Sequence, residues 1–293
     1  MLKAPQELVA AAGVRLIWMD NDNAAFYKEL NASFHSKQIF ASVPSVSLIL
    51  RGQKKCRDFE GNEYTANEGE MIFLPRDVFW ISDITPGNKS FQSYIFFFSE
   101  RILEHFFANL PEVKNIRKQK NESRILVRQT PESILHYIQN LEKLFVSTEN
   151  GKNRLLDLKL LELMQLLSDH LQSEMNNLWH PALIDHKERS IVSFMEQFYA
   201  SSMTVEDFAL LTGRSKSTFN REFQQIYQKS PKQWLIDRKL EDAKSLLTHN
   251  NSDVTRIAFE LGYTNVSQFI KLFKRKFGVS PKQYYISNRT SHH

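Results

Sequence analysis

The last third of the chain contains the same pattern of residues twice, and this repeat constrains the fold more than any other feature. The first copy covers residues 204–234 and the second covers residues 253–284. The copies align at an offset of 49 residues before the central turn and at 50 after it, so the second turn is one residue longer. Self-similarity of this kind indicates a supersecondary unit that the chain uses twice.

Each copy is predicted to form two helices joined by a short turn. Thr204 and Asp253 are favourable N-cap residues. Gly213 and Gly262 suit the left-handed backbone that ends a first helix. The second helix of each copy then carries aromatic rings at four-residue intervals: Phe219, Phe223 and Tyr227, and Phe269, Phe273 and Phe277. These rings would pack the second helix against the first and fix the direction of its opposite face.

That opposite face is polar in both copies. It carries Ser217, Asn220, Arg221 and Gln224 in the first copy, and Val266, Ser267, Gln268 and Lys271 in the second. Arg, Lys, Asn and Gln can pair with base edges in the major groove of DNA, and short side chains allow close approach. A solvated helix face is the ordinary explanation for one such residue, but two faces in a repeat favour a DNA-reading surface.

Charge supports a nucleic-acid partner. Residues 187–293 contain 17 Lys and Arg against 10 Asp and Glu, whereas the remainder contains 21 against 23. No acidic residue follows Glu260. A basic segment on an otherwise near-neutral chain is typical of phosphate contact, although a basic run alone is more often simply solvated.

Residues 188–288 resemble the two-part DNA-binding domain of AraC/XylS-type transcription regulators. The resemblance is carried by the segments ALLTGRSKSTFNREF, RKLEDAKSLL and IAFELGYTNVSQFIKLFKRKFGVSPKQY, and by the one-residue difference between the turns. It implies an all-α domain with helix-turn-helix units at about 204–228 and 253–278, joined by a helix over about 231–248. The two recognition helices would then enter adjacent major grooves of double-stranded DNA, about 10 base pairs apart.

The resemblance also implies roles for single residues. Base contacts are expected from Ser217, Asn220, Arg221, Val266, Ser267, Gln268 and Lys271. Phosphate contacts are expected from Lys216, Lys232, Lys274, Arg275 and Lys282. Arg214 stands where the second copy has Tyr263, and it is either one more phosphate contact or a solvated charge.

The region from about residue 40 to 99 is predicted to form short strands. Strand-forming runs at 46–50, 71–74, 78–82 and 91–98 are separated by turn signals such as Glu60-Gly61-Asn62. Their order, and the segment EGEMIFLPRD in particular, resembles the cupin-type barrel that AraC-type regulators often carry in front. The predicted fold class is therefore α+β, with a cupin-like β-barrel and flanking helices ahead of the all-α domain.

Three helices are predicted after the barrel, at residues 99–110, 132–146 and 153–172. The third is apolar on nearly all sides and must be covered on more than one of them. The resemblance implies a homodimer through such helices, and a core formed within one chain is the alternative. Residues 1–175 would then form a regulatory and dimerisation domain, with a linker at 176–187.

The barrel also offers candidates for an effector site. Met71, Phe73, Trp80, Tyr94 and Phe96 are candidates for lining a ligand pocket, although alternating aromatic residues more often form plain core. None of the nine His residues lies between residues 36 and 104, so a catalytic metal is not expected, and neither is any other cofactor. Cys56 is interpreted as an ordinary strand cysteine rather than a reactive thiol.

The sequence is thus interpreted as a sequence-specific transcription regulator, an activator that contacts RNA polymerase and is controlled by a ligand or protein at its N-terminal domain. It is not expected to be an enzyme. The alternatives are a cupin-type metal enzyme fused to a DNA-binding module, and a nonspecific architectural DNA binder. One cysteine, and no signal segment or apolar run long enough to span a bilayer, indicate a cytoplasmic protein without membrane contact.

Overall fold

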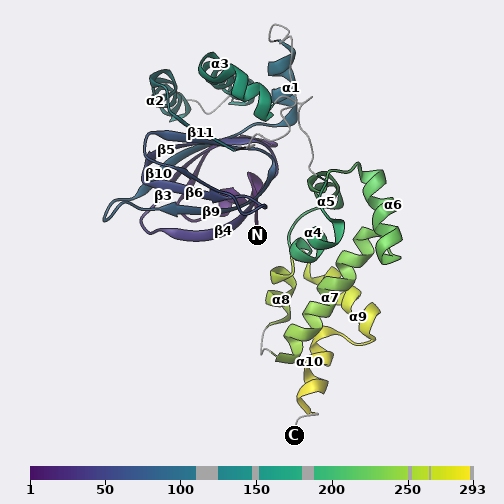
Figure 1. Ribbon diagram of the computed structural model, residues 1–293. Helices are drawn as coiled ribbons and strands as arrows, with labels where there is room; N and C mark the ends of the chain where they lie inside the picture. Colours follow the sequence, from purple (N-terminus) through teal and green to yellow (C-terminus); the bar gives the residue numbers. More distant parts are fainter. Residues whose placement is uncertain (110–124, 147–151, 180–187, 250–252, 264, 291–293) are drawn as a thin grey trace. The chain divides into compact units, whose positions relative to one another are not determined.

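The computed structural model describes residues 1–109, 125–146, 152–179, 188–249, 253–263 and 265–290. The chain divides into two compact units, Met1–Asp185 and His186–His293. The first unit combines strands with helices and the second is helical, which confirms the α+β class (Figure 1). Among the described residues, the helices include none that is long and apolar enough to cross a membrane.

Strands of the first unit form two sheets. One has the order β1-β4-β9-β6-β7 and the other β11-β8-β5-β10-β3-β2. Their bounds are β1 Leu2–Ala4, β2 Val14–Asp20, β3 Asn23–Leu30, β4 Phe34–Ala41, β5 Ser45–Arg51, β6 Gln53–Arg57, β7 Glu63–Ala66, β8 Glu70–Leu74, β9 Asp77–Ile84, β10 Phe91–Phe97 and β11 Leu126–Gln129. The two sheets remain separate hydrogen-bonded ladders, so the strands do not form the closed barrel that the sequence predicts.

The four predicted strands are confirmed as β5, β8, β9 and β10, and strands β6 and β7 lie on either side of the predicted turn at Glu60-Gly61-Asn62. The sheets begin much earlier than predicted, however, because β1 to β4 all precede residue 42. Strand β3 is not an edge strand, because it pairs with both β2 and β10, and its first four residues are buried. A strand covered on both faces lacks the polar–apolar alternation by which half-buried strands are recognised.

Helices cover one face of the six-stranded sheet (Figure 1). They are α1 Glu100–Ala108, α2 Glu132–Val146 and α3 Lys152–Trp179. Side chains alternate along each strand, so Tyr94 and Phe96 of β10 pack under these helices, while Phe91 and Phe97 belong to clusters between the sheets. The unit therefore has an apolar layer beneath the helices and another between the sheets.

Helix α3 extends beyond its predicted end. It bends at Leu171, whose backbone is non-helical (φ −138°, ψ 33°), and continues to Trp179. The buried Trp179 ring lies 5.3 Å from the ring of Phe73 and 4.9 Å from that of Phe98. Residues 176–179 are therefore helix and not linker, because Trp179 docks on the sheet. The rest of the predicted linker, 180–187, lies outside the described residues.

A buried charged cluster joins the two sheets. The fully buried carboxylate of Asp83, on β9, lies 2.7 Å from Nζ of Lys28 on β3 and 2.6 Å from Nζ of Lys54 on β6. Burial lowers the pKa of Lys28 to about 8, against the attraction of Asp83. Burial alone would raise the pKa of Asp83, but the two ammonium groups outweigh it and hold that pKa below its usual value.

The second unit contains two helix-turn-helix pairs joined by a long helix, as predicted. Its helices are α4 Ile191–Phe198, α5 Val205–Leu211, α6 Lys216–Tyr227, α7 Pro231–His249, α8 Val254–Glu260, α9 Val266–Phe277 and α10 Pro281–Thr290. Thr204 and Asp207 form a capping box at the start of α5, and Asp253 caps α8. Gly213 (φ +75°) and Gly262 (φ +76°) have the left-handed backbone expected at the turns.

Candidate nucleic-acid interface

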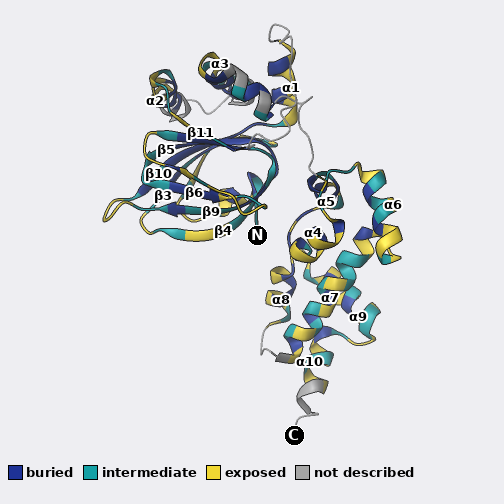
Figure 2. Cartoon of the chain, in the orientation of Figure 1, coloured by how far each residue is buried: buried dark blue, intermediate teal, exposed yellow. Residues whose placement is uncertain are grey.

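Helix α6 is held by aromatic packing on one side. Phe219 and Phe223 are fully buried, and the Phe223 ring lies 5.8 Å from that of Trp234 at the start of α7. Ser215 caps the helix by accepting a hydrogen bond from the backbone N–H of Thr218. With that side fixed, Ser217 and Arg221 are exposed and Asn220 is half-buried. Figure 2 shows exposed residues on α6.

Helix α9 is built in the same way. Phe269 and Phe273 are buried, and Asn265 caps the helix through a hydrogen bond from the backbone of Gln268. Ser267, Gln268 and Lys271 are exposed. Val266 differs from the other predicted base contacts, because its half-buried side chain packs against the core of this helix-turn-helix unit.

The structure adds one residue, Gln225, to the outward face predicted for α6, and places two predicted phosphate contacts on the same face of α9. Gln224 and Gln225 of α6 are exposed, as are Lys274 and Arg275 of α9. The offset of 50 residues pairs Gln224 with Lys274 and Gln225 with Arg275. At about 100° per residue, all four lie opposite the buried rings. Gln225 was missing from the predicted face, although its repeat partner Arg275 was a signal for it.

The predicted phosphate-contacting residues are all on the surface. Lys232, Lys274, Arg275 and Lys282 are exposed. Lys216 is exposed as well, but it forms a hydrogen-bonded ion pair with Glu206 of α5. The hydrogen bond from Lys216 lowers the pKa of Glu206. The three exposed cations of α9, Lys271, Lys274 and Arg275, give the second recognition helix a more positive face than the first.

Arg214 is neither a free phosphate contact nor a solvated charge, which were the two expectations from the sequence. Its half-buried guanidinium donates to the carboxylate of Glu222 on α6, with Nε 2.7 Å from Oε2. It also donates to the backbone carbonyl oxygens of Arg189 and Thr212. Arg214 therefore connects the segment before α4 to the turn and to the recognition helix, and its charge is used inside the domain.

The five candidate pocket residues do not line a common space between the sheets. Met71, Phe73, Tyr94 and Phe96 are buried on the outer face of the six-stranded sheet, under the helices. Trp80 is half-buried on the other sheet, with the guanidinium of Arg57 5.0 Å from the centre of its ring. The prediction placed these residues together because a strand pattern separates two faces but does not tell which face helices will cover.

The remaining chemistry of the first unit is that of a packed core. Cys56 is buried, and burial raises the pKa of its thiol to about 12, which opposes formation of a nucleophilic thiolate. Within the described ranges, His, Cys, Asp and Glu side chains form no group of three that could hold a metal ion.

Two family models match the chain, one on each unit. The "ExsA N-terminal regulatory domain" matches residues 44–176, and the "Helix-turn-helix domain" matches residues 208–285. Both are parts of AraC-family regulators. The chain is an AraC-type transcription regulator. As such, it binds DNA through the helix-turn-helix unit, and residues 44–176 belong to its regulatory half.

Relatives of this AraC-type regulator match most of its length. The thermoregulatory protein LcrF of Yersinia pestis and the virulence regulon transcriptional activator VirF of Yersinia enterocolitica are each 26% identical over 262 residues, covering 84% of this chain and 90% of their own. The HTH-type transcriptional regulator ExsA of Pseudomonas aeruginosa is 25% identical over 241 residues, covering 81% of this chain and 84% of its own.

Proposed function

We propose that this regulator activates transcription by reading two DNA boxes, one with α6 and one with α9. The observation that carries the proposal is the pair of outward polar faces, each fixed by two buried phenyl rings. A single helix joins the two pairs, so both helices belong to one compact unit and would enter adjacent major grooves about one turn apart. The name of VirF as a transcriptional activator supports activation over repression.

Within each box, the exposed polar residues contact the base edges. Arg221 and Lys271 occupy equivalent places in the repeat and have the length and donors to reach a guanine edge. Ser217 and Ser267 allow the helix to approach closely. Asn220, Gln268 and the half-buried Val266 complete the base-reading set, and Lys216, Lys232, Lys274, Arg275 and Lys282 contact phosphates.

Selection from random DNA duplexes with the full-length protein tests this function. A specific regulator enriches a motif of two boxes about one turn apart. A nonspecific architectural binder enriches no motif and is displaced equally by any DNA, because it depends on phosphate contacts and shape. The rival of a DNA-tethered cupin enzyme is tested by metal analysis of the purified protein, in which stoichiometric iron, manganese or zinc would support it.

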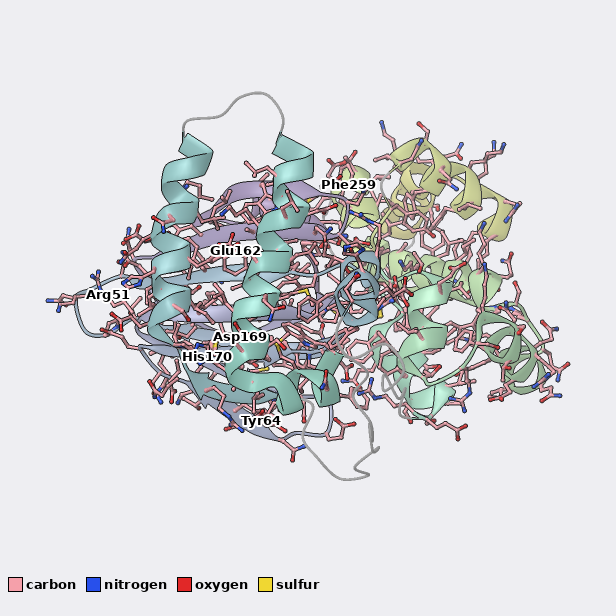
Figure 3. The ribbon with its side chains drawn as sticks, turned by 90° about the horizontal axis from the view of Figure 1, so that it is seen from above. Arg51, Tyr64, Glu162, Asp169, His170 and Phe259 are labelled. Carbon is pink, nitrogen blue, oxygen red and sulfur yellow. The ribbon has the colours of Figure 1, made fainter. Side chains whose placement is uncertain are left out.

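We further propose that the regulatory half forms a homodimer through the outer side of α3. Leu158 is 62% exposed there, more than any other large hydrophobic side chain of the described residues. Glu162, Asp169 and His170 lie along the same helix and would form the polar rim of the contact (Figure 3). In sedimentation experiments, Leu158→Asp should shift the protein to monomer, whereas Glu162→Gln, at the rim, should change the dimer population much less.

A signal at the regulatory half would then control DNA binding by changing the population of the dimer. The signal is a small molecule or a protein, and RNA polymerase is the further partner when the regulator activates. Because its working partner is chromosomal DNA, we place the protein in the cytoplasm. A dimer population that changes with added effector, measured by sedimentation, is the expected result, and an effector that alters transcription without altering the dimer would contradict this step.

A further inference from the structure

Charged side chains from both helix-turn-helix units meet on the connecting helix α7. Lys229 lies between α6 and α7, and its Nζ is 2.7 Å from Oδ2 of Asp237. Lys276, on recognition helix α9, donates from Nζ to the backbone carbonyl oxygen of Asp237 at 2.7 Å and pairs with the carboxylate of Glu241 at 2.9 Å. Its Nζ is also 4.0 Å from Oδ1 of Asp237. One residue of α7 thus contacts a lysine from each unit.

Lys276 is distinct from its neighbours in sequence. It follows Lys274 and Arg275, which are exposed, but its own side chain is only 23% exposed because it turns towards α7. Its partner in the first copy is Ile226, which is 48% exposed and therefore has no such role. The third cation of this basic run is consequently used inside the domain, and the first copy lacks an equivalent contact at that place.

The other contacts between α7 and α9 include an apolar cluster and the ammonium group of Lys244, whose Nζ lies 5.2 Å from the centre of the Phe277 ring. Leu240, Ala243 and Leu247 of α7 belong to the same buried cluster as Phe269 and Phe273 of α9. Apolar burial stabilises the pair but is non-directional, whereas hydrogen bonds hold a donor and an acceptor within narrow limits of distance and angle. A hydrogen bond from an ammonium group to a carbonyl oxygen is also stronger than one between neutral groups.

We propose that Lys276 is a positioning residue that sets the placement of α9 on α7, together with Glu241 and Asp237, and thereby determines the spacing between the two DNA boxes that the regulator accepts. Asp237 extends the contact to Lys229, which follows the last helix of the first helix-turn-helix pair. The inference rests on the proposed reading of two boxes by α6 and α9. Lys276 itself touches no base in this account.

The test compares full-length wild type with Lys276→Met, Lys276→Arg and Lys274→Met. Each is used for selection from duplexes in which two randomised boxes are separated by a variable number of base pairs. Wild type should enrich one separation. Lys276→Met should enrich the same box sequences with a broader range of separations. The ratio of its affinity for the best separation to its affinity for a separation one base pair longer should fall about tenfold. Lys276→Arg should restore the narrow range.

Lys274→Met is the matched control, because it removes an exposed cation two residues away on the same helix. It should weaken binding to all duplexes alike and leave the range of separations unchanged. If Lys276→Met behaves like Lys274→Met, with the range of the wild type, Lys276 is a phosphate contact and the inference is overturned.

Wild type itself distinguishes the two proposals. If it enriches no paired boxes, the two-box function fails and the inference fails with it, whereas a narrow separation in wild type and in Lys276→Met refutes the inference alone. Thermal unfolding would reveal a folding defect in Lys276→Met, and in that case Glu241→Gln is the variant to compare with wild type. This change keeps the size of a half-exposed side chain and should broaden the separations in the same direction to a smaller extent.

Discussion

Nε of Arg214 and Oε2 of Glu222 are 2.7 Å apart, and this ion pair joins the turn of the first helix-turn-helix pair to the middle of recognition helix α6. The same guanidinium donates to two backbone carbonyl oxygens. Arg214 therefore belongs to the support of the DNA-reading surface and not to the surface itself.

Replacing Arg214 with alanine should lower the free energy of unfolding by about 1–3 kcal/mol, because a half-buried carboxylate and two carbonyl oxygens lose their donor. Urea unfolding of the variant measures this loss. Lys232→Ala, which removes an exposed cation of α7, is the control and should change the stability by less than about 0.5 kcal/mol. A phosphate-contacting Arg214 would give the reverse pattern, with unchanged stability and a flatter dependence of DNA binding on salt.

Arg221→Ala should reduce binding to the selected DNA by about 1–3 kcal/mol and have little effect on random DNA, since a lost base contact affects only the correct sequence. Competition binding at fixed salt measures both. Equal losses on the two DNAs would remove Arg221 from the base-reading residues.

Lys274→Ala should weaken binding to selected and random DNA equally. It should also reduce the slope of log K against log salt by about 0.9, because one fewer counterion is released when a phosphate contact is lost. The measurement is a salt titration of wild type and variant. An unchanged slope would show that Lys274 is only solvated.

The buried lysine of the regulatory half gives a pH-dependent prediction. The pKa of Lys28 is about 8 in the folded protein and 10.5 when unperturbed. Between these values the unfolded chain retains a proton that the folded chain has lost, so the contribution of Lys28 to stability rises with pH in this window. The slope is at most about 1.4 kcal/mol per pH unit. Below about pH 8 the cost of burying the charge is present in full.

Lys28→Met removes this titration. The free energy of unfolding of wild type should therefore rise relative to that of the variant between pH 7 and pH 10, as measured by urea unfolding at each pH. Parallel curves for the two proteins would show that Lys28 keeps its proton throughout, and the lowered pKa would be wrong.

The DNA-binding half could be predicted almost completely from the sequence because its signals are local. Thr204, Asp253, Gly213 and Gly262 mark the helix boundaries through capping and backbone preference, and the periodic aromatic residues identify the buried faces. The directions of Arg214 and Lys276 were beyond such reasoning. Each side chain turns inward to a carboxylate on a helix, Glu222 for Arg214 and Glu241 for Lys276, and this depends on tertiary packing.

The regulatory half was predicted less well for a related reason. Strands β5 to β10 have turn signals around them, whereas β3 is covered on both faces and shows no alternation. The proposed pocket joined Phe73 and Tyr94, which lie under the helices, with Trp80, which lies on the other sheet. The topology decides which face of a strand is covered by helices, and the sequence of a short strand does not contain this information.

The most direct test of the account is the phasing of the two boxes. The full-length protein would be bound to its selected duplex, to the same duplex with five base pairs inserted between the boxes, and to a duplex with one box scrambled. Half a turn of DNA moves the second box to the opposite side of the helix. If α6 and α9 read both boxes from one compact unit, the insertion should reduce the affinity to that of the scrambled duplex. An affinity that the insertion leaves unchanged would contradict simultaneous reading by the two helices.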